Sequence, residues 1–318
     1  MVCYFSYSLS KLHDKNRVHN ISTDIPNHKL PPLNFSQQLY TSYCSPVPFY
    51  LLKLNKHFDF YQLKMEFLNK DELFTLALHL DLADLLNFCK TSKRYGKFCH
   101  NNIVWRGKIR HDFPNFKYED LIPELQHKSP REIYVLLYTI KVWKLNMDVN
   151  SLYFETNIVS FEPDIYVIPE YLHLPNLKWL SLGKNQIKRI PDNLNLPELH
   201  DLCLCRNKIT HIPNLSFPKL HNLLLTENLI EEIPNLSFKT LVTLHLQHNN
   251  ITNVPEDLNL PSLKILDLNR NKISAIPPNL NLPNLEILRL KQNPIFAIRN
   301  IQFPKLTQLE IDICNKEY

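Results

Sequence analysis

The stretch LKILDLNRNKISAI, residues 263–276, decides the fold of this chain, because five other segments repeat its spacing. Each of the six segments has leucine at its first, fourth and sixth positions, asparagine at the ninth, and isoleucine or valine at the fourteenth. The segments begin at Leu177, Leu199, Leu220, Leu241, Leu263 and Leu285, so that the period is 21 or 22 residues. Such a period predicts a solenoid, in which each unit buries its apolar side chains against its neighbours.

The leucine and asparagine positions have separate physical roles. The leucines of the L-x-L core alternate with outward residues, as expected for a short strand with its leucines facing inward. The asparagine is predicted to be buried where the chain leaves the strand, because its amide can satisfy backbone groups left unpaired there. This structural ladder contains Asn185, Asn207, Asn228, Asn249, Asn271, Asn293 and, in a seventh and incomplete unit, Cys314.

Two further features describe the outer side and the start of the repeats. Proline follows the last isoleucine or valine in five of the six segments, as at Pro191 and Pro213. It forbids a regular helix, so we expect an extended or 3₁₀ outer side. Residues 150–173 match only the tail of a unit and predict a degenerate first repeat that caps the first strand.

Period, leucine spacing and asparagine position together resemble the leucine-rich repeat. The resemblance implies an α/β solenoid of short parallel strands over 150–318. The outward strand positions, which we call the strand face, line the concave surface of such solenoids and predict binding of a target protein whose identity the sequence leaves open. The predicted target contacts are Trp179, Asp201, Leu224, His245, Ile265, Asp267, Ile287 and Arg289.

Composition excludes several function classes. Three glycines and no glycine-rich motif disfavour a phosphate-binding loop. The net charge of +5 is spread evenly, so no basic stripe predicts nucleic-acid binding. No apolar stretch is long enough for a membrane span, and the first residues do not resemble a signal peptide. Seven scattered cysteines predict reduced thiols and an intracellular protein, in the cytoplasm or the nucleus.

Two clusters within the repeats could suggest chemistry. His200 and His221 occupy the same position in adjacent units and should stack about 4.8 Å apart. Cys203 and Cys205 share one face, with His245 two units further on, but their spacing matches no zinc motif. We expect solvated histidines and inert thiols, and therefore no metal, no cofactor and no enzymatic activity.

A separate helical pattern precedes the repeats. Asn69 and Glu72 have the spacing of a capping box, with apolar residues following at helical intervals. Asp81 opens a second helix and Ser92 a third, whose apolar face continues to Trp105. Helices this short must pack on one another to be stable, so 65–113 predicts a compact helical domain.

This order of residues resembles an F-box. Glu72 and Leu73, Leu80 and Asp81, Asp84 to Leu86, Thr91 to Lys93 and Trp105 match the family pattern, whereas Asn69 replaces its proline and Tyr95 its internal tryptophan. The resemblance implies docking on a Skp1-type adaptor of a cullin-based ubiquitin ligase. The implied adaptor contacts are Leu68, Leu73, Leu76, Leu80, Leu85 and Leu86.

The whole arrangement predicts a substrate-recognition subunit. A helical connector over 114–149, with a capping box at Ser129 and Glu132, links the F-box-like domain to the repeats, whereas 1–64 predicts a poorly ordered or atypical extension. The arrangement and its composition, rich in lysine, asparagine and isoleucine, resemble those of F-box/leucine-rich-repeat proteins of giant DNA viruses of amoebae. The resemblance implies that the protein acts in the cytoplasm of a host cell. The alternative is a plain interaction scaffold, with the helical domain serving only as a cap.

Overall fold

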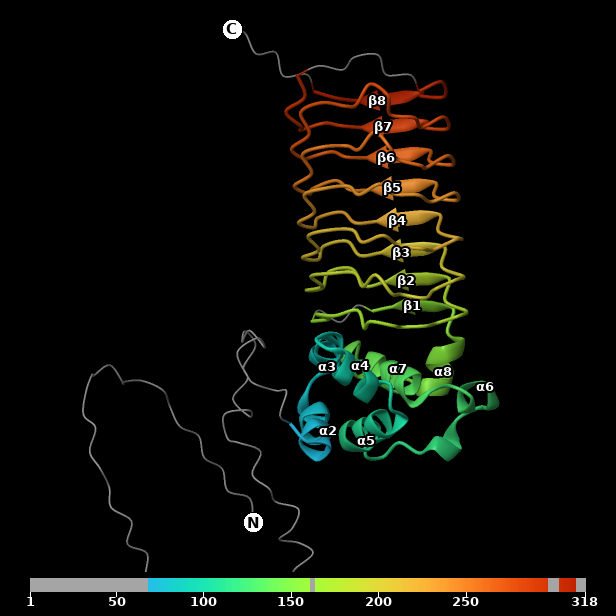
Figure 1. Cartoon of the computed structure of the whole chain (residues 1–318). Coiled ribbons are helices and arrows are strands. Elements are labelled where there is room, and N and C mark those ends of the chain that lie inside the picture. The colour runs from blue at the N-terminus through green and yellow to red at the C-terminus, as the bar shows by residue number, and fades with distance from the viewer. Residues whose placement is uncertain (1–67, 161–163, 297–302, 313–318) are drawn as a thin grey trace, which may run out of the picture. The chain divides into compact units, whose positions relative to one another are not determined.

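A computed structural model describes residues 68–160, 164–296 and 303–312 of the chain. The predictions made for 1–64 and for Cys314 lie outside these residues. Helices come first along the described chain, and a parallel sheet follows. Figure 1 shows the strands stacked one on the next, with the helices at the β1 end.

Four helices form what we call the helical module: α2 (Lys70–His79), α3 (Leu82–Lys90), α4 (Lys93–Cys99) and α5 (Asn102–Asp112). The predicted capping box of Asn69 and Glu72 is confirmed, as are the N-caps Asp81 and Ser92. The third predicted helix is split in two. The Asn101 side chain accepts a hydrogen bond from the backbone N–H of Ile103 at 2.9 Å, which caps a new helix where the pattern predicted continuity.

A largely buried ion pair lies within α5 and contacts the connector. The Nζ of Lys108, only 2% exposed, contacts the Asp112 carboxylate at 2.9 Å and donates to the Leu78 carbonyl at 2.8 Å. The Tyr134 hydroxyl donates to the same carboxylate at 2.6 Å. Burial by itself would raise the pKa of Asp112, but hydrogen bonds from Tyr134, His111 and Lys108 and the charge of Lys108 hold that pKa below its usual value.

The prediction that all cysteines are reduced is wrong for one pair. Cys89 of α3 and Cys99 of α4 form a disulfide across ten positions of sequence. The packing of α3 against α4 brings the two side chains together, which sequence spacing alone did not indicate.

The connector contains η3 (Tyr118–Asp120), α6 (Pro123–Gln126), α7 (Pro130–Val142) and α8 (Val149–Phe154). The capping box of Ser129 and Glu132 at the start of α7 is confirmed. The buried Trp143 indole donates to the Val167 carbonyl at 3.0 Å, which ties the end of α7 to the first turn of the repeats.

Charged groups reinforce the junction between helices and repeats. Glu170 is 5% exposed and contacts Lys90 at 3.2 Å and Arg189 at 2.5 Å. The Arg131 guanidinium lies 3.9 Å from the centre of the Tyr171 ring. These contacts bridge residues far apart in sequence, so the helices form one compact unit with the repeats.

Eight strands of three residues form one parallel sheet in sequence order. The strands are β1 (Asn157–Val159), β2 (Trp179–Ser181), β3 (Asp201–Cys203), β4 (Asn222–Leu224), β5 (Thr243–His245), β6 (Ile265–Asp267), β7 (Ile287–Arg289) and β8 (Gln308–Glu310). Equivalent positions of successive repeats are direct partners, as in the pairing of Leu202 with Leu223. The predicted solenoid is confirmed, and β1 belongs to the degenerate first unit.

The predicted asparagine ladder is also confirmed. The Asn228 Oδ1 accepts from the Ile209 N–H of the preceding unit at 3.1 Å. Its Nδ2 donates to the carbonyls of Leu204 and Leu225, both at 3.0 Å, and to that of Thr226 at 3.4 Å. The same pattern recurs at Asn207, Asn249, Asn271 and Asn293. Each asparagine therefore bridges two units through backbone groups that water cannot reach.

The outer side of the described repeats, 164–296, contains no helix, so the extended form of the prediction is confirmed. A column of left-handed residues was not foreseen. The residue before each ladder asparagine has φ between 55° and 59° although none is glycine: Lys184, Arg206, Glu227, His248, Arg270 and Gln292. None of the helices in the described residues is long and apolar enough to cross a membrane.

Candidate functional site

The strand face gathers the predicted target contacts into two adjacent columns. Trp179, Asp201, Ile265 and Ile287 lie in the first column, which the strand pairing aligns from β2 to β7. The second column contains Leu224, His245, Asp267 and Arg289. All eight thus lie on one side of one sheet, and their role in binding stays a prediction.

The β1 end of the strand face is apolar. Trp179 is 48% exposed and Val159 is 45% exposed, and both lie on neighbouring strands. Exposed tryptophan is enriched where proteins bind other proteins, since it combines a large apolar area with few rotatable bonds. Sequence reasoning missed Val159 because the strand of the degenerate unit does not follow the repeat pattern. The sequence feature that could have identified Val159 is its distance of 22 residues, one repeat period, from Ser181, with which it pairs.

The β8 end of the strand face is ionic. Arg289 lies 3.5 Å from Asp267 and 3.1 Å from Glu310, and Lys291 lies 3.5 Å from Glu310. Asp267 is only 6% exposed and also accepts from the Asn269 N–H at 3.1 Å. These charges partly neutralise one another, so this end offers hydrogen bonds rather than a field of one sign.

His245 lies between the two ends. Burial lowers its pKa, the charge of Asp267 opposes that shift, and the charge of Arg289 adds to it. The imidazole is therefore neutral at pH 7 and can both donate and accept a hydrogen bond.

The structure shows how the side chains of the two clusters noted in the sequence are arranged. The His200 and His221 rings stack as predicted, with centroids 5.2 Å apart. Cys203 and Cys205 lie with their sulfurs 3.6 Å apart, and both are free thiols. Within the described part of the chain, no group of three or more histidine, cysteine or acidic side chains could hold a metal ion.

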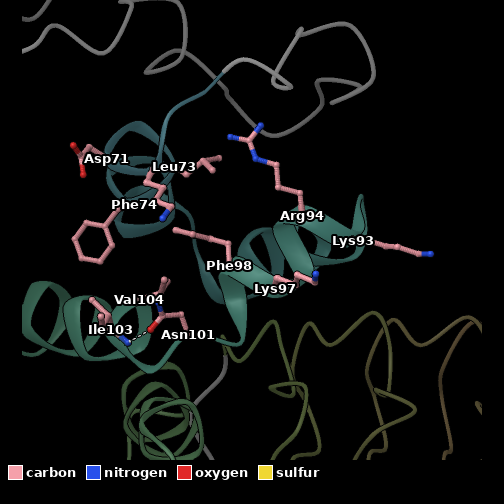
Figure 2. A pocket seen from close by; sticks show the side chains of 11 residues that line it. Asp71, Leu73, Phe74, Lys93, Arg94, Lys97, Phe98, Asn101, Ile103 and Val104 are labelled. Atoms are coloured by element: carbon pink, nitrogen blue, oxygen red, sulfur yellow. Dashed lines mark hydrogen bonds between the residues drawn. The ribbon is translucent and has the colours of Figure 1, made fainter.

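A second candidate site is a pocket of about 950 Å³ on the helical module. Figure 2 shows Leu73 and Phe74 of α2 at one side and Phe98 of α4 at another. Ile103 and Val104 of α5 complete its apolar lining. The polar residues at its edge are mostly basic: Lys70, Asp71, Lys93, Arg94, Lys97 and Asn101.

The structure places the predicted adaptor contacts mainly in the core. Leu73, Leu76, Leu85 and Leu86 are at most 7% exposed, and Leu68 and Leu80 are half-buried. Of the four buried residues, Leu73 alone lines the pocket. Leu76, Leu85 and Leu86 hold the helices together and cannot meet a partner while the module is folded.

The side chains that a partner could reach were missed by the sequence reading. Ile103 is 66% exposed, and Phe74 and Phe98 are half-buried at the pocket. Helical periodicity identifies an apolar residue without saying whether another helix covers it.

Comparisons with known proteins agree with the repeat fold. The family model described as Leucine Rich repeats (2 copies) matches residues 239–282. No curated protein matches the chain. The fold is therefore that of the leucine-rich-repeat class, a parallel solenoid preceded by helices.

Solved structures of the same class are similar over part of the chain. InlP of Listeria monocytogenes is 30% identical over 42% of this chain and 39% of its own, with a TM-score of 0.39. The receptor in a TLR13–ssRNA13 complex is 30% identical over 45% of this chain and 23% of its own, with a TM-score of 0.39. The plant peptide hormone receptor RGFR1, solved with RGF2, is 24% identical over 44% of this chain and 28% of its own, with a TM-score of 0.35. The chain thus spans less than two thirds of each of these relatives.

Proposed function

We propose that this chain is a protein-interaction scaffold that binds a target protein on its strand face. The observation that carries the proposal is Trp179, a half-exposed indole on a sheet whose equivalent positions are aligned from strand to strand. With Val159 it provides an apolar anchor at the β1 end, and the ionic β8 end supplies polar contacts at the other end of the same face. A buried aromatic anchor combined with hydrogen-bonding groups is typical of protein interfaces.

The mechanism is binding without chemistry. A rigid array of parallel strands holds its outward side chains in place before the target arrives, which reduces the entropy lost on binding. We expect no catalytic step from the strand face.

Trp179 also provides the assay. The chain has three tryptophans, and Trp105 and Trp143 are at most 1% exposed. Acrylamide quenching of the native protein therefore reports mainly on the strand face, and a bound target should protect Trp179 from the quencher.

The discriminating experiment compares two charge substitutions at equally exposed apolar positions. Trp179→Asp should abolish capture of a specific protein that the wild type retains, as measured by quantitative mass spectrometry. Leu229→Asp is the matched control, because Leu229 is 45% exposed and lies outside the strand columns. Equal loss with both variants, or no loss with Trp179→Asp, would contradict binding on the strand face.

A second function is favoured by the pocket on the helical module. We infer that this module acts as an F-box, docking on a Skp1-type adaptor so that the repeats deliver their target to a ubiquitin ligase. Its support is the F-box-like sequence together with an apolar pocket bordered by Lys70, Lys93 and Lys97. Placement alone would then raise the concentration of the target near the ligase.

Binding of purified Skp1-type adaptor to the full chain separates the two functions. Ile103→Glu should weaken the complex at least tenfold by titration calorimetry, whereas Phe154→Glu should not, because Phe154 is 50% exposed on α8, away from the pocket. Absence of binding by the wild type would leave the chain as a scaffold without a ligase connection.

A further inference from the structure

Two thiols project from the same side of one strand of the strand face. Cys203 ends β3 and Cys205 follows two residues later, so the alternation of an extended chain directs both side chains outward. Their sulfurs lie 3.6 Å apart, and both residues are half-buried and free of disulfide bonds. Two soft donor atoms thus lie close enough together on the surface to contact one ion.

Small residues lie beside the sulfurs on the side of the neighbouring strand β2. On the β2 side, the residue next to Cys205 is Gly183, and a Cβ added there would lie 3.9 Å from the Cys203 sulfur. The Ser181 hydroxyl is also hydrogen-bonded to Cys203. On the β4 side, Leu224 pairs with Cys203. The two sulfurs are thus bordered by Ser181 and Gly183 on the β2 side and by an apolar residue on β4.

We propose that Cys203 and Cys205 together bind one soft divalent metal ion, of the class of Zn²⁺ or Cd²⁺, through both sulfurs. In a tetrahedral zinc site with Zn–S bonds of about 2.3 Å, two thiolates lie about 3.8 Å apart. The observed sulfur separation of 3.6 Å is close to that geometry without any movement of the backbone. Thiolate pairs select soft ions over Mg²⁺ and Ca²⁺.

Binding of the ion as a dithiolate complex displaces to solvent the protons that the two thiols hold, and the oxidation state of sulfur and metal does not change.

The two sulfurs leave the coordination of the ion incomplete. His245 belongs to the same column as Cys203, but it lies two strands away, at about 9.6 Å for a strand spacing of about 4.8 Å. A zinc–imidazole bond of about 2.1 Å cannot span that distance. Two positions of a tetrahedral ion thus stay available for water or for a side chain of a bound protein. Binding of the ion itself does not depend on the target, so it can fail or succeed separately from the proposed function.

The test titrates Cd²⁺ into the full chain under oxygen-free buffer without added reductant, so that the Cys89–Cys99 disulfide stays closed and no added thiol competes. The wild type should develop the ultraviolet band of cadmium–thiolate bonds at one equivalent and release protons, and Mg²⁺ should produce neither signal. Cys203→Ser and Cys205→Ser should each weaken this binding at least tenfold.

Controls separate this site from the other cysteines. Cys314→Ser should leave the titration unchanged, and the double variant Cys203→Ser/Cys205→Ser measures the signal from all remaining thiols. Circular dichroism checks that each variant is folded. A wild-type signal equal to that of the double variant, or no signal at all, would overturn the proposal.

Discussion

The repeats and the helical module reach a stable core in opposite ways. In the repeats one contact set recurs, so that Asn207 and Asn228 make the same hydrogen bonds to different units. In the helical module every contact is singular, as with the Lys108–Asp112 pair or the Cys89–Cys99 disulfide. A repeated contact can be recognised from its period, whereas a singular one depends on which helices meet.

This difference has an energetic consequence. Each repeat contacts only its neighbours, so damage in the ladder should spread along the sheet from the altered unit. Damage in the helical module should affect α2 to α5 together, because they share one small core. The following substitutions test this comparison, from the largest expected effect to the smallest.

Asn228→Ala should have the largest effect. It removes the acceptor of the buried Ile209 N–H and one of two donors to each of three carbonyls. The carbonyls of Leu204, Leu225 and Thr226 keep their second donors, which are Asn207, Asn249 and the Arg206 N–H. One unpaired buried N–H costs about 1–3 kcal/mol and each of the three other lost hydrogen bonds about 0.5–1.5 kcal/mol, so we expect a loss of about 4 kcal/mol, measured by denaturant unfolding. Hydrogen exchange should show the loss centred on β3 to β5.

The matched control is Asn235→Ala, since Asn235 is exposed on the outer side of the same unit. Its effect should stay within about 0.5 kcal/mol. Comparable losses at the two positions would mean that the ladder does not stabilise the repeats.

Asp112→Asn tests the helical module. It leaves the Lys108 ammonium, only 2% exposed, with the Leu78 carbonyl as a partner but without a counter-charge. Removing one member of a buried pair costs about 3 kcal/mol or more. The exposed pair of Lys264 and Glu286 is the control, and Glu286→Gln should cost less than about 1 kcal/mol.

The same variant has a predictable pH dependence. Because the folded pKa of Asp112 is lowered, its contribution is fully present above the unfolded pKa of about 3.9 and is lost as the pH falls through the folded pKa. The difference in unfolding free energy between wild type and Asp112→Asn should therefore be constant from pH 7 to pH 5 and shrink below about pH 4. A difference that shrinks instead as the pH rises above 5 would contradict this role for Asp112.

The disulfide should stabilise the helical module alone. Closing a loop of about ten residues is worth about 2–3 kcal/mol, which Cys89→Ser/Cys99→Ser should remove. Alkylation of the unreduced native chain followed by mass spectrometry should leave these two cysteines unlabelled while Cys203 is labelled. Labelling of Cys89 and Cys99 under these conditions would contradict the disulfide. In the double variant, hydrogen exchange should become faster in α3 and α4 than in wild type and change little in the repeats, which would sharpen the comparison.

His248→Gly should have the smallest effect and the opposite sign. His248 has φ 59°, where a side chain costs about 1 kcal/mol or more, and glycine removes that cost while adding freedom to the unfolded chain. We expect a gain of about 0.5 kcal/mol by thermal unfolding. Asn250→Gly is the control, because Asn250 lies outside the left-handed region, and this variant should destabilise the protein. A loss of stability in both variants would contradict the role of the positive φ at His248.

The repeats show how far sequence reasoning reaches. The position of the ladder asparagine, the direction of the L-x-L leucines and the helix-free outer side all followed from period and residue type. The left-handed column did not, because His248 and its equivalents are ordinary polar residues that carry no glycine signal.

The candidate sites show where such reasoning ends. The alignment of Trp179 with Asp201 was predictable because a fixed period places equivalent residues on neighbouring strands. The accessible residues of the helical module were not, since Leu76 and Phe74 are both apolar residues on one helix. Only the packing of the helices buries Leu76 and leaves Phe74 half-buried at the pocket.

The sequence by itself determined the solenoid, its ladder and the helix caps, because each depends on contacts that are local or recur at a constant interval. Only the tertiary structure decided the Cys89–Cys99 bond, the pocket between α2, α4 and α5, and the 3.6 Å approach of two thiols on the strand face. These features depend on distances between side chains, which residue type and spacing constrain but do not fix.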